Sequence, residues 1–211
     1  KFLKLNGKFP IILTFTDAWF ICPRVSLFNI NYSICNEIDI INCKKCGFKE
    51  NELNKRNNDS NELINIIDYV VFPSKLLETI FKNNKLKFNN YKIINNGLDY
   101  KYFKFNYSKK VNHKEINLGY VGPIVRQKGL HIIIQSFKKI KFQNINLNIY
   151  GEAFDEHYIS LIKKLCGNDK RIKFYGKYDY KELSEIYSKI DIAIYPSICY
   201  ESYSLSLVES L

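Results

Sequence analysis

The second half of the chain alternates short apolar runs with longer amphipathic segments, and this alternation constrains the fold more than any other feature. The apolar runs are rich in Ile and Tyr, end in Gly or Pro, and fall at 116–122, 145–151, 172–176 and 190–196. Between them, apolar residues recur at helical spacing over 130–142, 156–166 and 181–188. Strands joined through single helices form βαβ units, which require a parallel sheet. The pattern therefore predicts an α/β fold.

The first half shows a less regular version of the same pattern. Strands are expected at 10–16, 69–72 and 91–94, and a helix at 75–82. The polar stretch 51–61 (NELNKRNNDSN) indicates a surface loop. Residues 99–114 are rich in Lys and Tyr and lack periodicity, which indicates a linker. We therefore expect two domains, one over 1–98 and one over 115–211.

The composition limits the classes of partner. The chain has 32 Lys and Arg against 21 Asp and Glu, a net charge of +11. Its cations are interspersed with acids, so the charge indicates a solvated surface and no nucleic-acid site. A phosphate-bearing substrate or an anionic membrane face would also be attracted. No apolar run approaches the ~20 residues of a membrane span, so a cytoplasmic protein is expected, and peripheral contact with the inner face of the cytoplasmic membrane stays open.

The loop after residues 116–122 carries a first candidate site. Gly122 ends the expected strand, and Arg126 and Lys128 precede the next expected helix. Small residues let backbone amides approach a phosphate, and the two cations supply charge-assisted hydrogen bonds. A plain strand–turn–helix with exposed cations would have the same sequence pattern.

The second candidate site is the segment YPSICYESYSLSLVE, residues 195–209. Glu201 lies in the loop after the last expected strand, and Glu209 lies one to two turns into the helix that follows. Open α/β sheets bind ligands at the carboxyl ends of their strands. There the two carboxylates could accept hydrogen bonds from sugar and ribose hydroxyls, while amides around 203–205 face phosphates. Two glutamates at this spacing also occur on ordinary surface helices.

Cysteines form a third group. Four of the six fall in one segment, at Cys22, Cys35, Cys43 and Cys46. The last two are separated by two residues, which is the knuckle spacing of zinc sites, whereas the other intervals are irregular. A structural zinc, reduced thiols and disulfides therefore all remain open. With zinc, the chain could instead be a zinc-knuckle binding protein on an α/β scaffold.

Taken together, the motifs GYVGPIVRQKGL, NIYGE, IKFYG, IDIAIYPS and ESYSLSLVE resemble the donor half of the retaining glycosyltransferases of family 4. That family has the GT-B fold of two facing Rossmann-like domains with parallel sheets. In the same order, TFTDAWFICPR, VVFPS and INNGLD resemble its acceptor-side domain and the entry to its linker. The resemblance implies transfer of a sugar from a nucleoside diphosphate sugar to a cell-envelope glycan or lipid-linked acceptor, with retention of configuration and without a catalytic metal or cofactor. A nucleotide-sugar epimerase or a phosphorylase of the same fold is the alternative.

The resemblance also implies roles for single residues. Lys128 would hold the donor diphosphate with help from Arg126, Glu201 would contact the transferred sugar, and Glu209 would bind ribose. The other donor-side positions would be Gly122, Ser197, Tyr203, Ser204 and Leu205. Thr16 and Asp17 would face the acceptor-side cleft; Thr16 stands where the family usually has a histidine, and Pro123 where it often has an arginine.

The chain has no Met and lacks the glycine-rich loop and the closing helices that begin and end members of this family. We therefore expect a fragment with both domains incomplete, which would not turn over by itself. The cysteine-rich segment 22–46 would be an insertion in its acceptor-side domain.

Overall fold

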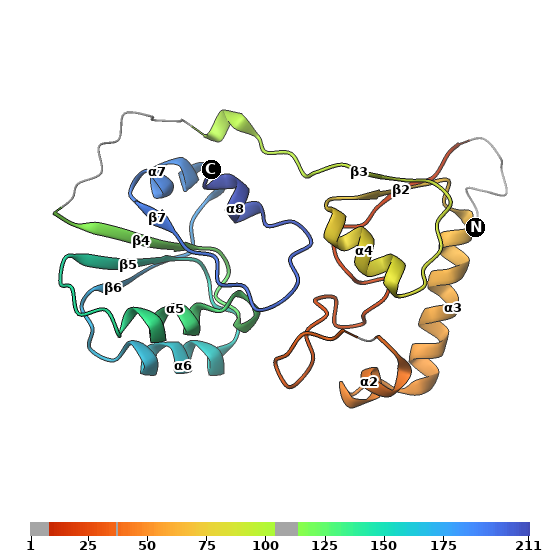
Figure 1. Ribbon diagram of the computed structural model, residues 1–211, viewed down its shortest axis with the longest axis horizontal. Coiled ribbons are helices and arrows are strands. Elements are labelled where there is room, and N and C mark those ends of the chain that lie inside the picture. Colours follow the sequence, from red (N-terminus) through yellow and green to blue (C-terminus); the bar gives the residue numbers. More distant parts are fainter. Residues whose placement is uncertain (1–8, 37, 104–113) are drawn as a thin grey trace. The chain divides into compact units, whose positions relative to one another are not determined.

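A computed structural model of the chain describes residues 9–36, 38–103 and 114–211. They form two units, each with its own sheet (Figure 1). The first unit runs to Asn96 and includes residues 199–203, and the second comprises residues 97–198 and 204–211. Neighbouring strands run parallel in both sheets, which confirms the predicted α/β class.

The second unit contains a four-stranded sheet in the order β6-β5-β4-β7. Its strands are β4 (Ile116–Val121), β5 (Ile145–Tyr150), β6 (Ile172–Gly176) and β7 (Ile192–Ala193). Its helices are α5 (Leu130–Phe137), α6 (Glu156–Cys166), α7 (Leu183–Ser188) and α8 (Leu205–Glu209), with short 3₁₀ helices at η1 (Tyr100–Tyr102), η2 (Arg126–Lys128) and η3 (Tyr180–Glu182). Each expected strand and helix of this half is present in the predicted order.

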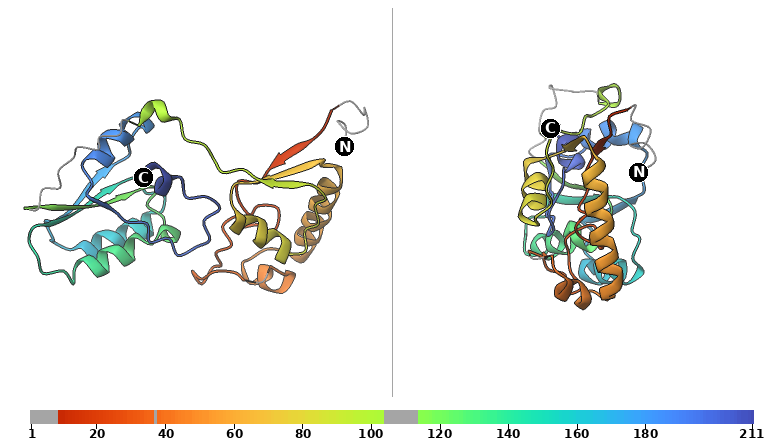
Figure 2. Two further views of the ribbon diagram at one scale, coloured as in Figure 1. Left: turned by 45° about the horizontal axis from the view of Figure 1, so that its top comes forward. Right: turned by 90° about the vertical axis from the view of Figure 1, so that its right-hand side faces the viewer.

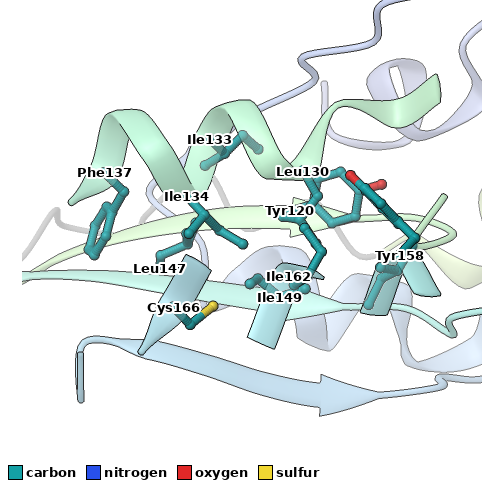
Figure 3. Packing of buried hydrophobic residues seen from close by; sticks show 11 residues of the cluster. Tyr120, Leu130, Ile133, Ile134, Phe137, Leu147, Ile149, Tyr158, Ile162 and Cys166 are labelled. Carbon is teal, nitrogen blue, oxygen red and sulfur yellow. The ribbon is translucent and has the colours of Figure 1, made fainter. Parts of the chain in front are cut away.

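Helices cover both faces of this sheet. Because successive side chains of a strand point to opposite faces, neighbouring residues of β5 enter different clusters. Ile149 packs with α5 and α6 in the cluster shown in Figure 3, whereas Tyr150 packs with Val121 and α7 on the other face. The views in Figures 1 and 2 agree that α5 and α6 lie together on one side. Full burial of side chains such as Ile149 and Ile162 contributes about 1.5 to 3 kcal/mol each.

The first unit has a three-stranded sheet in the order β1-β2-β3. Its elements are β1 (Ile12–Thr14), α2 (Ile40–Lys45), α3 (Glu50–Ile66), β2 (Tyr69–Phe72), α4 (Lys75–Asn83) and β3 (Tyr91–Ile93). Aromatic rings fill its core: the Phe15 centroid lies 4.4 Å from that of Phe81 and 5.3 Å from that of Phe72. No helix in the described parts of either unit is long and apolar enough to span a bilayer.

The largest error of the sequence analysis concerns residues 51–61. They were expected as a surface loop but lie inside the 17-residue helix α3. The helix is polar on most of its surface and buries only Leu53, Ser60 and Ile64, so its apolar stripe is too thin to detect. Tertiary contacts hold it instead: the Ser60 hydroxyl donates to the Phe20 carbonyl, and the Arg56 guanidinium stacks 4.4 Å from the Trp19 ring centroid.

Several element boundaries also differ from expectation. The strand expected at 190–196 is shorter in the structure, because β7 spans only Ile192–Ala193 and pairs with β4 through these two residues. The helix expected to reach residue 142 ends at Phe137. In the expected linker 99–114, η1 forms a turn whose Tyr102 ring meets Tyr180 at 5.5 Å, and residues 104–113 lie outside the described part of the chain.

Helix α4 carries a buried ion cluster. Ser74 caps the helix through its hydroxyl, which accepts from the Leu77 amide at 3.2 Å. The side chain of Glu78 is completely buried and bonds the ammonium groups of Lys75 and Lys82. Burial alone would raise the pKa of Glu78, but the hydrogen bonds from the two lysines outweigh it and lower the pKa to about 2. The charged carboxylate therefore stabilises the first unit.

We predict that Glu78→Gln destabilises the first unit by about 1 to 3 kcal/mol near neutral pH, because the charge-assisted hydrogen bonds are lost. Since the pKa of Glu78 is depressed on folding, its contribution is present above about pH 4.5 and disappears as the pH falls toward 2. Urea unfolding at several pH values measures this difference. The control Glu50→Gln removes a carboxylate bonded to Lys44 at an exposed site and should change little. Equal losses for the two variants would contradict the assignment.

Candidate functional site

The carboxyl ends of β4 and β5 approach each other closely enough to exclude side chains. Both strands end in glycines with a φ of 150°, Gly122 and Gly151. A Cβ added to Gly151 would collide with the Gly122 carbonyl oxygen, so only glycine fits there. Because the strands are parallel, the loops after β4, β5 and β6 all leave from this edge. The edge therefore presents bare backbone to whatever binds above it.

An open cavity of about 310 Å³ lies along this edge, entirely within the second unit. It is lined by Gly122, Pro123, Gly151, Glu152, Phe154, Lys177, Tyr178 and Tyr180. The lining combines aromatic rings with one pair of opposite charges, since the Lys177 ammonium lies 3.5 Å from the Glu152 carboxylate. Small-molecule pockets usually have volumes of about 300 to 1,000 Å³, so this one suits a single ring system with a short polar extension.

Glu209 is a partly buried residue of α8 that acts electrostatically on one of the tyrosines lining the cavity. Burial raises the pKa of its carboxyl group. Burial raises the pKa of Tyr178 as well, and the charge of Glu209 raises it further, which places the carboxylate near a ring that lines the cavity. Helix α8 is held there by two phenols, because the hydroxyls of Tyr187 and Tyr195 both donate to the Ser206 carbonyl, at 3.0 and 2.7 Å.

The loop that carries Lys128 packs against the segment after β7. Gly129 has a φ of 71°, and a Cβ there would collide with the Pro196 carbonyl oxygen. The Ile198 amide donates to the Gln127 carbonyl at 2.8 Å. The structure thus brings together the first candidate loop and the start of the second candidate segment, which lie about 70 residues apart in the sequence.

Arg126 lies close to the start of α5. Burial and then the positive charge of Arg126 lower the pKa of His131, whose Nδ1 lies 2.8 Å from the Tyr158 hydroxyl. The same charge lowers the pKa of Tyr158 against the larger rise that burial causes. The Arg126 guanidinium therefore lies near His131 and Tyr158. Its role in binding a donor diphosphate stays a prediction.

The other predicted donor residues are divided between the units. Ser197, Ser204 and Leu205 lie in the second unit, where Ser204 is the N-cap residue of α8 without a side-chain cap hydrogen bond. Glu201 and Tyr203 belong to the segment 199–203, which is grouped with the first unit. The structure therefore brings Gly122, Lys128 and Glu209 into one unit but leaves the role of Glu201 as a prediction.

The predicted acceptor-side residues follow β1 in the first unit. Thr16 is exposed, and an Asp17 carboxylate oxygen accepts from the Trp19 amide at 2.7 Å. The cysteines lie in the same unit: Cys22 and Cys43 are buried, Cys35 and Cys46 are partly buried, and none of the four forms a disulfide. In the described ranges, no group of three or more His, Cys, Asp or Glu side chains is already arranged to hold a metal ion.

The sequence analysis missed six residues of the cavity: Gly151, Glu152, Phe154, Lys177, Tyr178 and Tyr180. The sequence contained a signal for Glu152 and Lys177, because each of them follows a glycine that ends an expected strand. In a parallel sheet such positions gather at one edge, whatever their separation in the sequence. The tyrosines could not be singled out, since the chain has 16 of them.

A parallel sheet with a glycine-lined cavity at its carboxyl edge, and a basic loop before a helix, is the layout of a nucleotide-binding α/β domain. Residues 103–211 match the family model described as Glycosyl transferases group 1, which covers more than half of the 211-residue chain. The chain belongs to this family of glycosyltransferases.

Individual relatives agree with this assignment. The capsular polysaccharide biosynthesis glycosyltransferase CapM of Staphylococcus aureus is 33% identical in an alignment of 104 residues that covers 44% of this chain and 27% of that protein. Sucrose-phosphate synthase from Thermosynechococcus elongatus superposes with a TM-score of 0.70 at 19% identity, over 99% of this chain and 49% of its own. Anabaena Alr3699/HepE, solved with UDP and glucose, superposes with a TM-score of 0.69 at 17% identity, over 98% of this chain and 51% of its own. The chain thus spans about half the length of these solved structures, and their fold confirms the predicted GT-B class.

We predict that Gly129→Ala destabilises the second unit by about 3 kcal/mol or more, because the new Cβ adds a collision with the Pro196 carbonyl to the cost of a positive φ. The matched control is Gly176→Ala, which also has a positive φ but nothing within 4 Å of the added atom, and it should cost about 1 to 2 kcal/mol. Chemical denaturation measures both values. Similar losses would show that the loop does not press on Pro196.

Proposed function

We propose that this protein transfers a sugar from a nucleoside diphosphate sugar to a cell-envelope glycan or a lipid-linked acceptor, and that its second unit binds the donor nucleotide. The observation that carries the proposal is the cavity at the carboxyl edge of the four-stranded sheet, with Lys128 on a loop packed beside that edge and Glu209 next to a lining tyrosine. Membership in the glycosyltransferase family supports it, as do the role in capsular polysaccharide biosynthesis that the name of CapM states and the UDP bound in HepE.

The cavity is proposed to hold the nucleoside. Its volume of about 310 Å³ fits one base with part of its ribose, and Tyr178 and Tyr180 offer aromatic rings against which a base can stack. Base–aromatic stacking contributes about 1 to 3 kcal/mol per base. The Glu209 carboxylate can accept hydrogen bonds from both ribose hydroxyls. Burial of that carboxylate is costly until such donors arrive, which is typical of a binding residue.

The diphosphate would lie over the bare backbone between Gly122 and Gly151. A side chain at either glycine would keep phosphate oxygens away from the strand ends. Lys128 is proposed to neutralise the diphosphate, with Arg126 as a second cation. Charge accumulates on this group as the bond to the sugar breaks, so cations held in place there stabilise the transition state more than the bound donor.

Glu201 is proposed to contact the transferred sugar, and the reaction is proposed to retain the configuration at the anomeric carbon. Retention follows from attack on the face that the leaving diphosphate vacates, with a donor phosphate oxygen taking the acceptor proton. No resident metal ion or organic cofactor takes part in this scheme. Analysis of the product's anomeric configuration by NMR tests it, and an inverted product or an absolute requirement for a divalent ion would contradict it.

We predict that the full-length protein binds at least one of UDP, GDP and ADP, and that Lys128→Ala weakens this binding about tenfold or more, which corresponds to about 1.4 kcal/mol. Titration calorimetry at constant ionic strength gives the two dissociation constants. Lys164→Ala, on the exposed side of α6, is the matched loss of one positive charge and should leave the affinity unchanged. If none of the three nucleotides binds saturably, the donor-site proposal fails.

We predict opposite effects of Glu209→Gln on stability and binding. Because burial raises the pKa of Glu209, the carboxylate destabilises the folded state at neutral pH. Replacing it with the uncharged amide of Gln should therefore raise the melting temperature at neutral pH. The gain should shrink as the pH falls toward the raised pKa, where the native glutamate takes up its proton. Nucleotide affinity should fall about tenfold, since an amide oxygen is a weaker acceptor for ribose hydroxyls.

The control for this experiment is Glu156→Gln, at an exposed position of α6. It removes the same charge without the burial and should alter neither the pH dependence nor the affinity. A Glu209→Gln protein that loses stability at neutral pH, or that binds nucleotide as well as the parent, would contradict the role assigned to Glu209.

A further inference from the structure

Four cysteines that are scattered over the segment 22–46 meet around one small cavity of the first unit. Cys22, Cys35, Cys43 and Cys46 all line this cavity, whose volume is about 10 Å³. A space of this size corresponds to about one water molecule or one ion. Neither remaining cysteine lines it: Cys166 is buried in α6, and Cys199 lies in the segment 199–203.

The four cysteines that line the cavity come from three separate backbone segments. Cys22 ends a turn in which its amide donates to the Ala18 carbonyl at 2.8 Å. Cys35 closes a loop, with its amide bonded to the Leu27 carbonyl at 2.8 Å. Cys43 lies in α2 and Cys46 caps it, and the Cys46 amide donates back to the Cys43 carbonyl at 3.0 Å. Each of these contacts is between backbone groups, so they fix the backbone positions from which the four side chains reach the cavity.

The turn after Cys43 has the form of a zinc knuckle. Cys43 and Cys46 are three positions apart, and Gly47 follows with a φ of 94°. The Gly47 amide donates to the Lys44 carbonyl and the Phe48 amide to the Cys43 carbonyl, so the chain folds back on itself directly after the second cysteine. A tight turn of this kind places two thiolates of a Cys-x-x-Cys pair on one side of the backbone.

The second observation is a cation next to the cysteines, because Arg56 and Cys43 line a shared cavity of the first unit. The Nε and Nη2 atoms of Arg56 are buried and have no hydrogen-bond partner among the described residues. Burial lowers the pKa of Arg56, and the charges of Cys22 and Cys43 act in the opposite direction. A neutral thiol is a poor partner for a buried guanidinium, and an unsatisfied buried charge is costly.

We propose that Cys22, Cys35, Cys43 and Cys46 bind a single structural zinc ion and that Arg56 donates hydrogen bonds to its thiolates. Four thiolates around Zn²⁺ carry a net charge of about −2, which supplies the negative partner that the Arg56 guanidinium lacks. Binding releases one proton from each thiol and forms four Zn–S bonds, with no change of oxidation state. The structure describes the metal-free arrangement, in which the sulfurs surround the cavity without yet converging as ligands. Rotation about χ1 redirects a cysteine sulfur without moving its backbone.

A metal ion would also stabilise a segment that has little regular secondary structure. Among the described residues between Cys22 and Cys46, the chain contains one six-residue helix and an isolated antiparallel bridge from Phe28 to Ile34. Three non-glycine residues in this stretch have a positive φ, at Val25, Leu27 and Tyr32. Such backbone persists only where the surroundings determine it, and a bound metal supplies folding free energy directly.

The first experiment measures metal content. The full-length protein is purified under reducing conditions, and zinc is quantified by mass spectrometry and by colorimetric release with a thiol-blocking mercurial. We expect about one zinc per chain in the parent and in Cys199→Ser, and close to none in Cys43→Ser and Cys46→Ser. Zinc-free parent protein with four reduced thiols, or with disulfides among these cysteines, would overturn the proposal.

The second experiment does not depend on a cysteine variant folding. Zinc is removed from the parent by chelation and replaced with Co²⁺, whose tetrahedral tetrathiolate complex has characteristic visible and charge-transfer absorption. Saturation at one Co²⁺ per chain, reversed by added zinc, is expected. Arg56→Gln should weaken metal affinity about 10- to 100-fold, whereas its neighbour Lys55→Gln, which is exposed on α3, should not. Equal affinities for the two variants, or an octahedral spectrum, would contradict the assigned site.

Discussion

The backbone-to-backbone contact between the ends of β4 and β5 is the constraint on which the second unit depends. Gly151 lies against the Gly122 carbonyl, and Gly129 lies against the Pro196 carbonyl, so the strand ends and loops meet without intervening side chains. These contacts fix the three loops that leave β4, β5 and β7. Larger residues at either glycine would separate the loops, and the cavity and Lys128 would no longer share one edge of the sheet. The position of the candidate site thus depends on glycines, whose lack of a side chain lets the strand ends and loops meet.

Hydrophobic periodicity predicted the second unit well because its two central strands, β4 and β5, carry buried side chains and its helices α5, α6 and α7 each bury one stripe. In β5, apolar residues alternate with Asn, and the last two residues, Ile149 and Tyr150, pack against helices on opposite faces. Helix α3 was missed for the converse reason, since contacts from Ser60 and Arg56 hold it and neither residue belongs to an apolar stripe. Hydrophobic periodicity detects helices that bury an apolar stripe. It misses helices that polar side chains hold against the rest of the unit.

The candidate site shows a similar division. Gly122, Lys128 and Glu209 could be named because they stand at strand ends or at spacings that indicate ligand chemistry, and the structure places them in one unit. The residues that shape the cavity, such as Tyr178, could not, because an aromatic residue after a strand is as compatible with a core as with a binding surface. What distinguishes Tyr178 is its proximity to the partly buried carboxylate of Glu209, and this depends on how α8 packs.

The attachment of α8 has a consequence for how such a site can change during evolution. Tyr187 and Tyr195 hold the helix through the main-chain oxygen of Ser206, and not through any side chain of the helix itself. A main-chain oxygen is present whichever amino acid is encoded. Mutations that alter the side chains of α8 can therefore accumulate without dislodging it, provided that the two phenols are kept. Substitutions in α8 can therefore change which nucleotide is preferred without changing the position of the helix.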